Sequence, residues 1–186
     1  MPGFNVDSLK AVVAGYGGFA VGSKYDVMII PRDPSTLTGV ITSMLQDLRF
    51  LCESTSLPVR SLATVDSQIH GPPTKMPYQS TYTEAAFSFY LTEFMAQKKL
   101  FDAWLDMIIN PRTGNVSFFD QYSCTIEIRK FSRRAESPNT DSPDYSVKLI
   151  DAFPSIVGEV QLSHSAGNEI LKLPVTFMYR RWETLN

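Results

Sequence analysis

The clearest alternation of apolar and polar residues along the chain lies at 83–92. Ala85, Phe87, Phe89 and Leu91 fall on one face of an extended segment, and mostly polar residues fall on the other. Similar patterns predict further strands at 25–32, 48–53, 123–131, 145–151, 159–163 and 171–182. Most connections between these segments are too short for parallel crossovers. The chain is therefore predicted to form a mainly β (α+β) domain with predominantly antiparallel strands.

The hydrophobic period changes in the segment from Phe94 to Ile109, which follows the best strand. Apolar residues recur there at helical spacing, and Asn110-Pro111 ends the pattern. We predict one amphipathic helix that lies on the body of the domain, whereas 35–46 fits either a short helix or a loop. The bulky residues of the strongest segments are the predicted structural core: Phe87, Phe89, Phe101, Trp104, Ile108 and Phe177.

A long excursion at 62–82 interrupts the series of strands. Gly71-Pro72-Pro73 and Pro77 break otherwise strand-like sequence, so this segment cannot be a central strand of a sheet. Its apolar residues should nevertheless not be left in water. The excursion is therefore expected to be extended at both ends and to find cover outside the central sheet.

Two other segments differ in composition from the rest of the chain. Residues 1–23 combine a short apolar run with Gly15, Gly17, Gly18 and Gly22, which indicates a flexible arm with a short helix capped by Asn5 or Asp7. Residues 132–144 are almost entirely polar and indicate an exposed loop between two strands. We expect residues 24–186 to form a single domain that carries both the excursion and this loop.

Composition and charge exclude several classes of function. The 186 residues carry a formal net charge of -2, so no broad basic face is available for tight binding of duplex DNA. The one basic cluster, Arg129 to Arg134, is interpreted as the solvated base of a loop. Cys52 and Cys124 are expected to be buried, reduced thiols, which indicates a reducing, aqueous compartment. No apolar run is long enough to predict a membrane span.

The chain carries no constellation that predicts an enzyme, a cofactor site or a metal site. The Gly-rich run at 15–20 matches the sequence pattern of a dinucleotide-binding site. Gly22 and the nearby strand at Tyr25, however, leave no room for the helix that such a site requires. Asp102 and Asp106 are interpreted as an exposed helical pair. His70 and His164 accompany no recognisable nucleophile. A non-enzymatic role is therefore expected.

Several segments, in this order, resemble the tail tube protein family of contractile-tailed bacteriophages. The resemblance covers roughly Tyr25 to Trp182. Its residues are Leu57-Pro58 before the excursion, Phe101-Asp102-Ala103-Trp104 in the helix, Ala152 to Val160, Gly167-Asn168-Glu169-Ile170, and the closing Tyr179-Arg180-Arg181-Trp182-Glu183. The segment from Phe153 onward, a proline turn followed by a Gly-Glu strand and an Asn-Glu turn, is the most specific part.

This resemblance implies an antiparallel β-sandwich or half-open barrel with one flanking helix. Copies would join edge to edge into a hexameric ring with a continuous inner β-barrel, and rings would stack into a tube in the virion tail, assembled in the host cytoplasm. The excursion would then contact a neighbouring subunit or the next ring. Its contact residues are expected to be Val65, Ile69, Met76, Tyr78 and Gln79.

The implied partners are other copies of the chain, sheath and baseplate proteins, and DNA that passes through the lumen without tight binding. The arm and the polar loop look like additions to the family pattern, so a tube-initiating or adaptor ring of the baseplate stays open as an alternative. The tube of a bacterial contractile secretion system and a monomeric barrel that binds a small ligand also stay open. A ring-forming protein and a ligand-binding barrel would differ in whether the chain self-associates.

Overall fold

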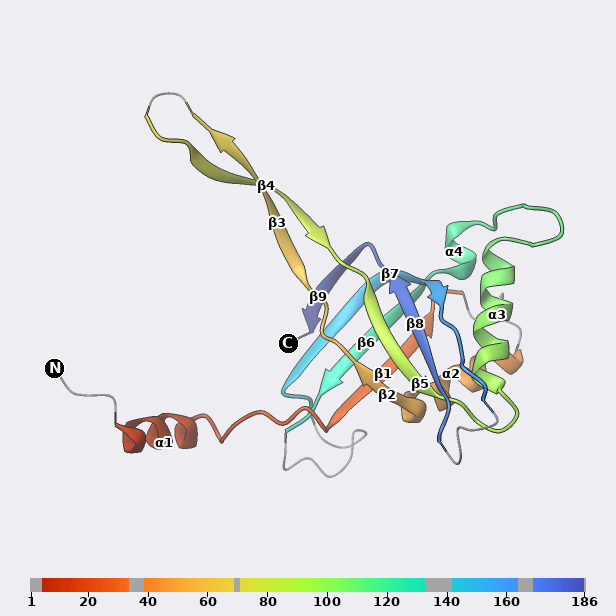
Figure 1. The fold of residues 1–186 in the computed structure, drawn as a ribbon, viewed down its shortest axis with the longest axis horizontal. Helices are drawn as coiled ribbons and strands as arrows, with labels where there is room; N and C mark the ends of the chain where they lie inside the picture. Colours follow the sequence, from red (N-terminus) through yellow and green to blue (C-terminus); the bar gives the residue numbers. More distant parts are fainter. Residues whose placement is uncertain (1–4, 34–38, 69–70, 133–141, 164–168, 186) are drawn as a thin grey trace.

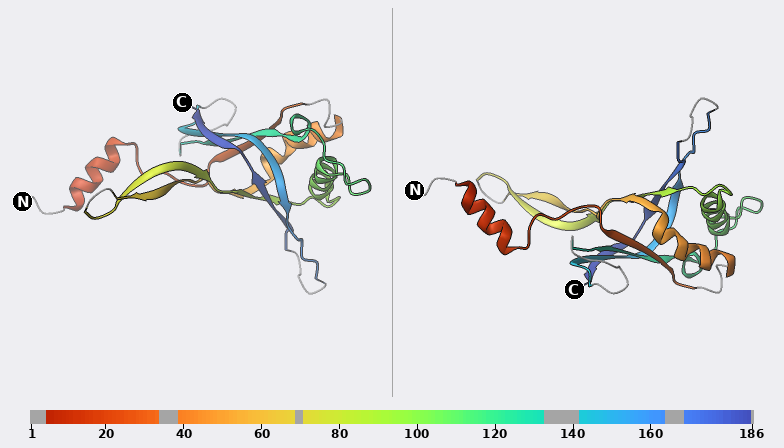
Figure 2. Two further views of the ribbon diagram at one scale, coloured as in Figure 1. Left: turned by 90° about the horizontal axis from the view of Figure 1, so that it is seen from above. Right: turned by 90° about the horizontal axis from the view of Figure 1, so that it is seen from below.

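The body of the protein is an open antiparallel sheet flanked by helices (Figures 1 and 2). The computed structural model describes residues 5–33, 39–68, 71–132, 142–163 and 169–185. The strands of the body are β1 (Tyr25–Pro31), β2 (Cys52–Thr55), β5 (Ala85–Tyr90), β6 (Cys124–Lys130), β7 (Tyr145–Val157), β8 (Lys172–Met178) and β9 (Arg181–Leu185). They follow the order β1-β6-β7-β8-β5-β2, and β9 also pairs with β7. This arrangement confirms the predicted mainly β, antiparallel, half-open fold.

The long strand β7 joins the two halves of the sheet. One edge of β7 pairs with β6, and the other edge pairs first with β9 and then with β8. The change of partner occurs at Asp151, which has a positive φ of 56° and bends the strand. The sheet curls so that its two end strands approach each other: the Tyr25 hydroxyl of β1 donates hydrogen bonds to the carbonyls of Cys52, at 3.0 Å, and Glu53 in β2.

Four helices complete the described structure: α1 (Val6–Gly15), α2 (Gly39–Leu51), α3 (Ala96–Ile108) and α4 (Phe119–Tyr122). α2 lies against β1, and α3 lies against the body near β7. α1 stands away from the sheet (Figure 1). The predicted helix at 94–109 is confirmed with slightly shorter ends, but the expectation of a single flanking helix was wrong because α2 also covers the sheet.

The core lies between α3 and the sheet and is rich in aromatic rings. Phe89, Phe101 and Trp104 have no solvent exposure, and the ring of Phe177 meets that of Phe87 edge-on at 5.4 Å between centroids. Trp104 donates its indole Nε1–H to the Tyr122 carbonyl at 3.0 Å, which satisfies its buried polar atom. Each residue that the sequence suggested for the core is buried here.

Two strand predictions near the middle and the end of the chain were wrong. Residues 48–51 belong to α2, since Leu45 and Leu48 continue a helical period and are buried against the sheet. Residues 159–163 form no strand, because the ladder between β7 and β8 ends at Val157. There the chain passes close to β8: a Cβ on Gly158 would lie 2.5 Å from Pro174 Cγ.

Two further boundaries differ from the sequence prediction. The segment interpreted as a proline turn after Ala152 continues β7, and Pro154 is accommodated beside a register shift, where a missing N–H is tolerated. The single strand predicted at 171–182 is divided into β8 and β9. The division faces the bend at Asp151, and the Arg180 N–H donates to the Ile150 carbonyl at 3.1 Å across it.

Candidate assembly surfaces

The excursion forms a hairpin that projects from the body (Figures 1 and 2). Its strands are β3 (Arg60–Ser67) and β4 (Thr74–Tyr82), and among the described strands they pair only with each other. Gly71 turns the chain with a φ of 82°, and Gln68 Nε2 donates to its carbonyl at 2.7 Å. Pro77 lies next to a register shift, so its missing N–H does not interrupt the regular part of the ladder. The prolines thus exclude this segment from the central sheet without preventing an extended structure.

The suggested contact residues lie along this hairpin with their side chains in solvent. Val65 and Met76 are register partners, so they share one face, and each is 52% exposed. Tyr78 is 67% exposed, and Gln79 is exposed opposite Ala63. Ile69 lies outside the described residues. Leu62 was not among the predicted contact residues, because only its apolar character within the excursion marked it, but it also lies on the hairpin and is 59% exposed.

The base of the hairpin is held by aromatic contacts with the C-terminal strands. The Arg60 guanidinium lies over the ring of Trp182, 5.6 Å from its centroid. The rings of Tyr82 and Tyr179 lie 6.2 Å apart. These contacts place one anchor on each strand of the hairpin, so the direction in which it leaves the body is fixed by the sheet.

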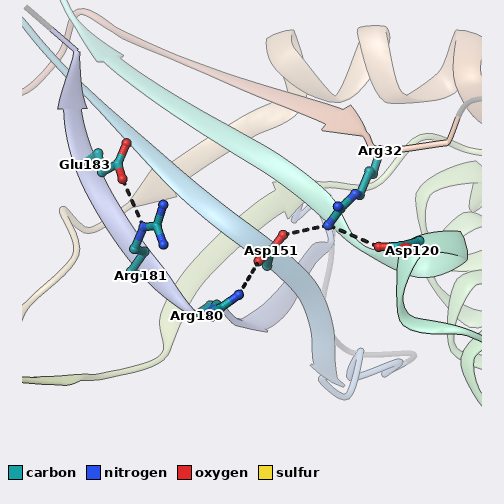
Figure 3. A network of polar contacts seen from close by, with 6 residues as sticks. All are labelled: Arg32, Asp120, Asp151, Arg180, Arg181 and Glu183. Carbon is teal, nitrogen blue, oxygen red and sulfur yellow. Dashed lines mark hydrogen bonds and ion pairs between the residues drawn. The ribbon is translucent and has the colours of Figure 1, made fainter.

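A network of ion pairs fixes the bend in β7 (Figure 3). Asp151 Oδ1 lies 3.1 Å from Arg32 Nη1, and its Oδ2 lies 3.6 Å from Arg180 Nη1. Arg32 also lies 3.2 Å from Asp120 of α4. The Asp151 carboxylate is largely buried, whereas the arginines reach solvent. The network therefore connects the end of β1, the bend in β7 and the short helix α4.

A second charged cluster is buried where β1, α2 and β6 meet. Asp26 is 4% exposed, and its two carboxylate oxygens each lie 2.6 Å from an arginine nitrogen, Arg49 Nε and Arg129 Nη2. We call these three residues the Asp26 clamp. The interpretation of Arg129 as part of a solvated loop base was wrong, because its guanidinium pairs with a buried carboxylate. Arg133 and Arg134 lie outside the described residues, as does most of the predicted loop at 132–144.

The seam between β1 and β2 has perturbed titratable groups. Burial raises the pKa of Tyr25 to about 12, and the nearby Cys52 contributes in the same direction. Glu53 accepts hydrogen bonds from Lys172 and from Ser88, and the Lys172 contact lowers the pKa of this carboxyl. Tyr25 therefore joins β1 to β2 as a neutral phenol at neutral pH, and Glu53 joins β2 to β5 and β8 as a carboxylate.

The described residues show the surroundings of both cysteines, of Asp102 and of the possible metal ligands. Burial raises the pKa of Cys52 to about 12 and that of Cys124 further, so neither thiol is activated as a nucleophile. Asp102 pairs with Lys98 rather than with a second carboxylate. No group of three or more His, Cys, Asp or Glu residues in this part of the chain could hold a metal ion. Both histidines lie outside the described ranges.

None of the helices in the described ranges is both long and apolar enough to span a bilayer.

Comparison with solved structures shows the fold. A chain of the sheath/tube terminator of an extracellular contractile injection system, PVC, matches with a TM-score of 0.62 at 17% identity, covering 90% of this chain and 97% of that one. A chain of the PVC sheath-tube complex gives 0.61 at 16% identity, covering 95% and 96%. A chain of the baseplate of the anti-feeding prophage gives 0.58 at 12% identity, covering 90% and 96%.

The family assignment comes from the sequence itself. Among curated proteins, none matches the chain significantly. The sequence model described as phage tail tube protein, however, matches residues 20–185, which is nearly the whole body of the structure. The chain belongs to the phage tail tube protein family and is a structural tube protein.

Proposed function

We propose that this chain is the repeated subunit of a phage tail tube, in which hexameric rings stack to form a conduit for DNA. The observation that carries the proposal is the apolar face of the projecting hairpin. Val65 and Met76 are register partners on that face, half exposed, and held away from the core by a base anchored to the body. Exposed apolar side chains on a rigid projection are typical of a protein interface.

The edges of the sheet support lateral association in the same proposal. β1 and β2 are the two end strands of the sheet, and among the described strands β9 pairs only with β7. Edge strands offer backbone N–H and C=O groups to a further strand. Joining such edges between copies would build a continuous inner barrel, while the hairpin would contact an adjacent subunit or the next ring. Neither contact requires a cofactor.

The remaining partners follow from this assembly. The tube would lie inside a sheath and start from a baseplate, in a virion tail assembled in the host cytoplasm. A tube-initiating ring of the baseplate is the second candidate, and the similarity to a chain of the anti-feeding prophage baseplate favours keeping it. The two differ in whether rings of this chain alone stack into long tubes.

Electron microscopy and size-exclusion chromatography of the concentrated protein test the proposal. In the test variant, an Asn-Gly turn replaces residues 65–76 and joins Thr64 to its register partner Pro77. The expected result is tubes for the unmodified chain and folded species without stacking for the variant. The matched control is Asp66→Asn with Lys75→Gln, which changes a neighbouring register pair but keeps the apolar one, and it should still stack.

A strictly monomeric unmodified chain at high concentration would contradict the proposal and favour a ligand-binding barrel. Normal stacking by the shortened variant would show that the hairpin does not mediate the stacking of rings.

Passage of DNA requires a wall that does not hold it. Duplex DNA carries a negative charge about every 1.7 Å of its axis, so a basic lumen would sum many attractions into an immobile complex. The formal net charge of -2 allows the lumen to be neutral or acidic. Purified rings should therefore retain duplex DNA no more than a neutral control protein at physiological salt in a filter-binding assay. Strong, salt-sensitive retention would show that the lumen is a binding site.

A further inference from the structure

The arm before the body carries an amphipathic helix whose apolar stripe is uncovered. α1 is capped by Asn5, whose Oδ1 accepts a hydrogen bond from the Asp7 N–H at 3.2 Å, and no residue of the helix is buried. A helix of this length is only marginally stable in water by itself. Its apolar side chains form one stripe along the helix: Val6, Leu9, Val12 and Val13.

A groove of complementary character lies between α2 and α3. It has a volume of about 450 Å³ and is lined mainly by apolar side chains. The buried Leu48 and Leu100 form part of its lining, as does Phe50, which is 74% exposed. Ala96, at the first turn of α3, is a small residue in the lining. A groove of this size and polarity suits the apolar face of a helix.

The helix and the groove lie at opposite ends of the molecule. In Figures 1 and 2, α1 lies on the side from which the hairpin projects, whereas α2 and α3 cover the other end of the sheet. Residues 16–24 join α1 to β1, with positive φ angles at Gly17 and Gly18. A surface at one end that fits a surface at the other end of the same molecule gives a head-to-tail contact between copies, which closes into a ring or grows along an axis.

We propose that α1 of one copy docks in the groove between α2 and α3 of a second copy, with Leu9 and Val12 facing Leu48 and Leu100. Docking covers the exposed stripe of α1 and the exposed ring of Phe50 in the groove, and it supplies the packing that the short helix lacks. The family match begins at residue 20, so α1 lies outside the matched segment, and this inference does not depend on the proposed tube function.

Cysteine cross-linking between two populations of the full chain tests the docking. Both populations carry Cys52→Ser, whose hydroxyl can keep the hydrogen bond to the Ser54 carbonyl, and Cys124 is buried. One population also carries Leu9→Cys and the other Ala96→Cys. After mixing and treatment with a short bismaleimide, the expected product is a covalent dimer that contains one chain of each kind. If Ala96→Cys does not fold, the exposed Phe50→Cys takes its place.

Two control variants test whether the contact is specific. Ala11→Cys, on the side of α1 opposite Leu9, should give clearly less dimer than Leu9→Cys. Adding Val12→Ser and Val13→Ser to the Leu9→Cys chain should weaken docking at least about tenfold, because two apolar side chains are then withdrawn from the contact. Equal yields from Ala11→Cys and Leu9→Cys would overturn the proposal.

A single chain with both Leu9→Cys and Ala96→Cys tests the alternative that the arm folds back. Exclusively intrachain bridges would show that the arm occupies its own groove and would overturn docking between copies. Electron microscopy of the same samples separates this proposal from the tube function. Tubes that form without the cross-link would contradict only the docking of α1. A cross-link in samples without rings or tubes would contradict only the proposed tube function.

Discussion

The core beneath α3 and the hairpin β3–β4 use apolar residues in opposite ways. Phe89, Phe101 and Trp104 are completely buried and contact one another or Phe177, whereas Val65 and Met76 in the hairpin remain half exposed. A two-stranded hairpin is at best marginally stable by itself. The body therefore provides the free energy of folding, whereas the hairpin leaves apolar surface exposed. Mutations in the two regions should separate stability from association.

The largest expected effect is that of Trp104→Ala. Removing this fully buried ring leaves a cavity and an unpaired Tyr122 carbonyl, and should lower the free energy of unfolding by ~3 to 5 kcal/mol. Chemical denaturation followed by fluorescence or circular dichroism measures the change. Val65→Ala in the hairpin is the control, with an expected change within about 0.5 kcal/mol. A loss below about 1 kcal/mol for Trp104→Ala would show that this ring does not anchor the core.

The next largest effect is expected at the Asp26 clamp. Asp26→Asn removes the charge that compensates Arg49 and Arg129, and should lower the free energy of unfolding by about 2 to 3 kcal/mol. The loss is smaller than for a fully buried ion pair because both arginines keep some solvent contact. The control is Asp102→Asn, which breaks the exposed pair with Lys98 and should cost about 0.5 kcal/mol or less. Equal costs for the two variants would mean that the clamp contributes no more than a surface ion pair.

A smaller effect is expected at the seam between β1 and β2. Tyr25→Phe removes the hydroxyl that bonds the Cys52 and Glu53 carbonyls and should cost about 1 kcal/mol at pH 7. Because the pKa of Tyr25 is raised to about 12 in the fold, its contribution is complete below its ordinary value near 10 and is lost as the pH rises through 12. Thermal unfolding from pH 8 to 11 should therefore show a steeper alkaline loss for the unmodified chain than for Tyr25→Phe. Parallel curves would contradict this assignment.

The smallest effect on stability should accompany a large loss of assembly. Val65→Ser with Met76→Ser changes only half-exposed side chains, so the unfolding free energy should move by less than about 0.5 kcal/mol. Assembly, measured by light scattering, should nevertheless decrease strongly, because the apolar register pair is lost. A destabilisation comparable to that of Asp26→Asn would show that the hairpin belongs to the folding core.

Sequence patterns predicted the elements whose burial is periodic. The alternation in β5 and the helical spacing around Trp104 correspond to real buried faces, because each element presents one side to the core. α2 was less predictable, since its apolar residues fit a strand as well as a helix at the end near Leu48. β7 was predicted too short because Pro154 favours a turn locally, and only the register shift in the ladder with β8 accommodates it.

The candidate surfaces were predictable to a lesser degree. The prolines and apolar residues of the excursion marked it as a projecting segment, but its pairing and the exposure of Leu62 depend on the hairpin register. No local sequence pattern predicted the Asp26 clamp, because Asp26 and Arg129 are brought together by the pairing of β1 with β6. The groove between α2 and α3 likewise requires two helices that only the folded chain brings together.

The ladder between β1 and β6 also sets an order of events during synthesis. Tyr25 pairs with Lys130, so β1 leaves the ribosome about a hundred residues before its strand partner exists. At roughly 5 to 20 residues per second, β1 waits on the order of ten seconds, while the hairpin β3–β4 can close as soon as it emerges. The nascent chain must keep the apolar residues of β1 from other nascent chains during that interval, and the body becomes complete only when β8 and β9 arrive.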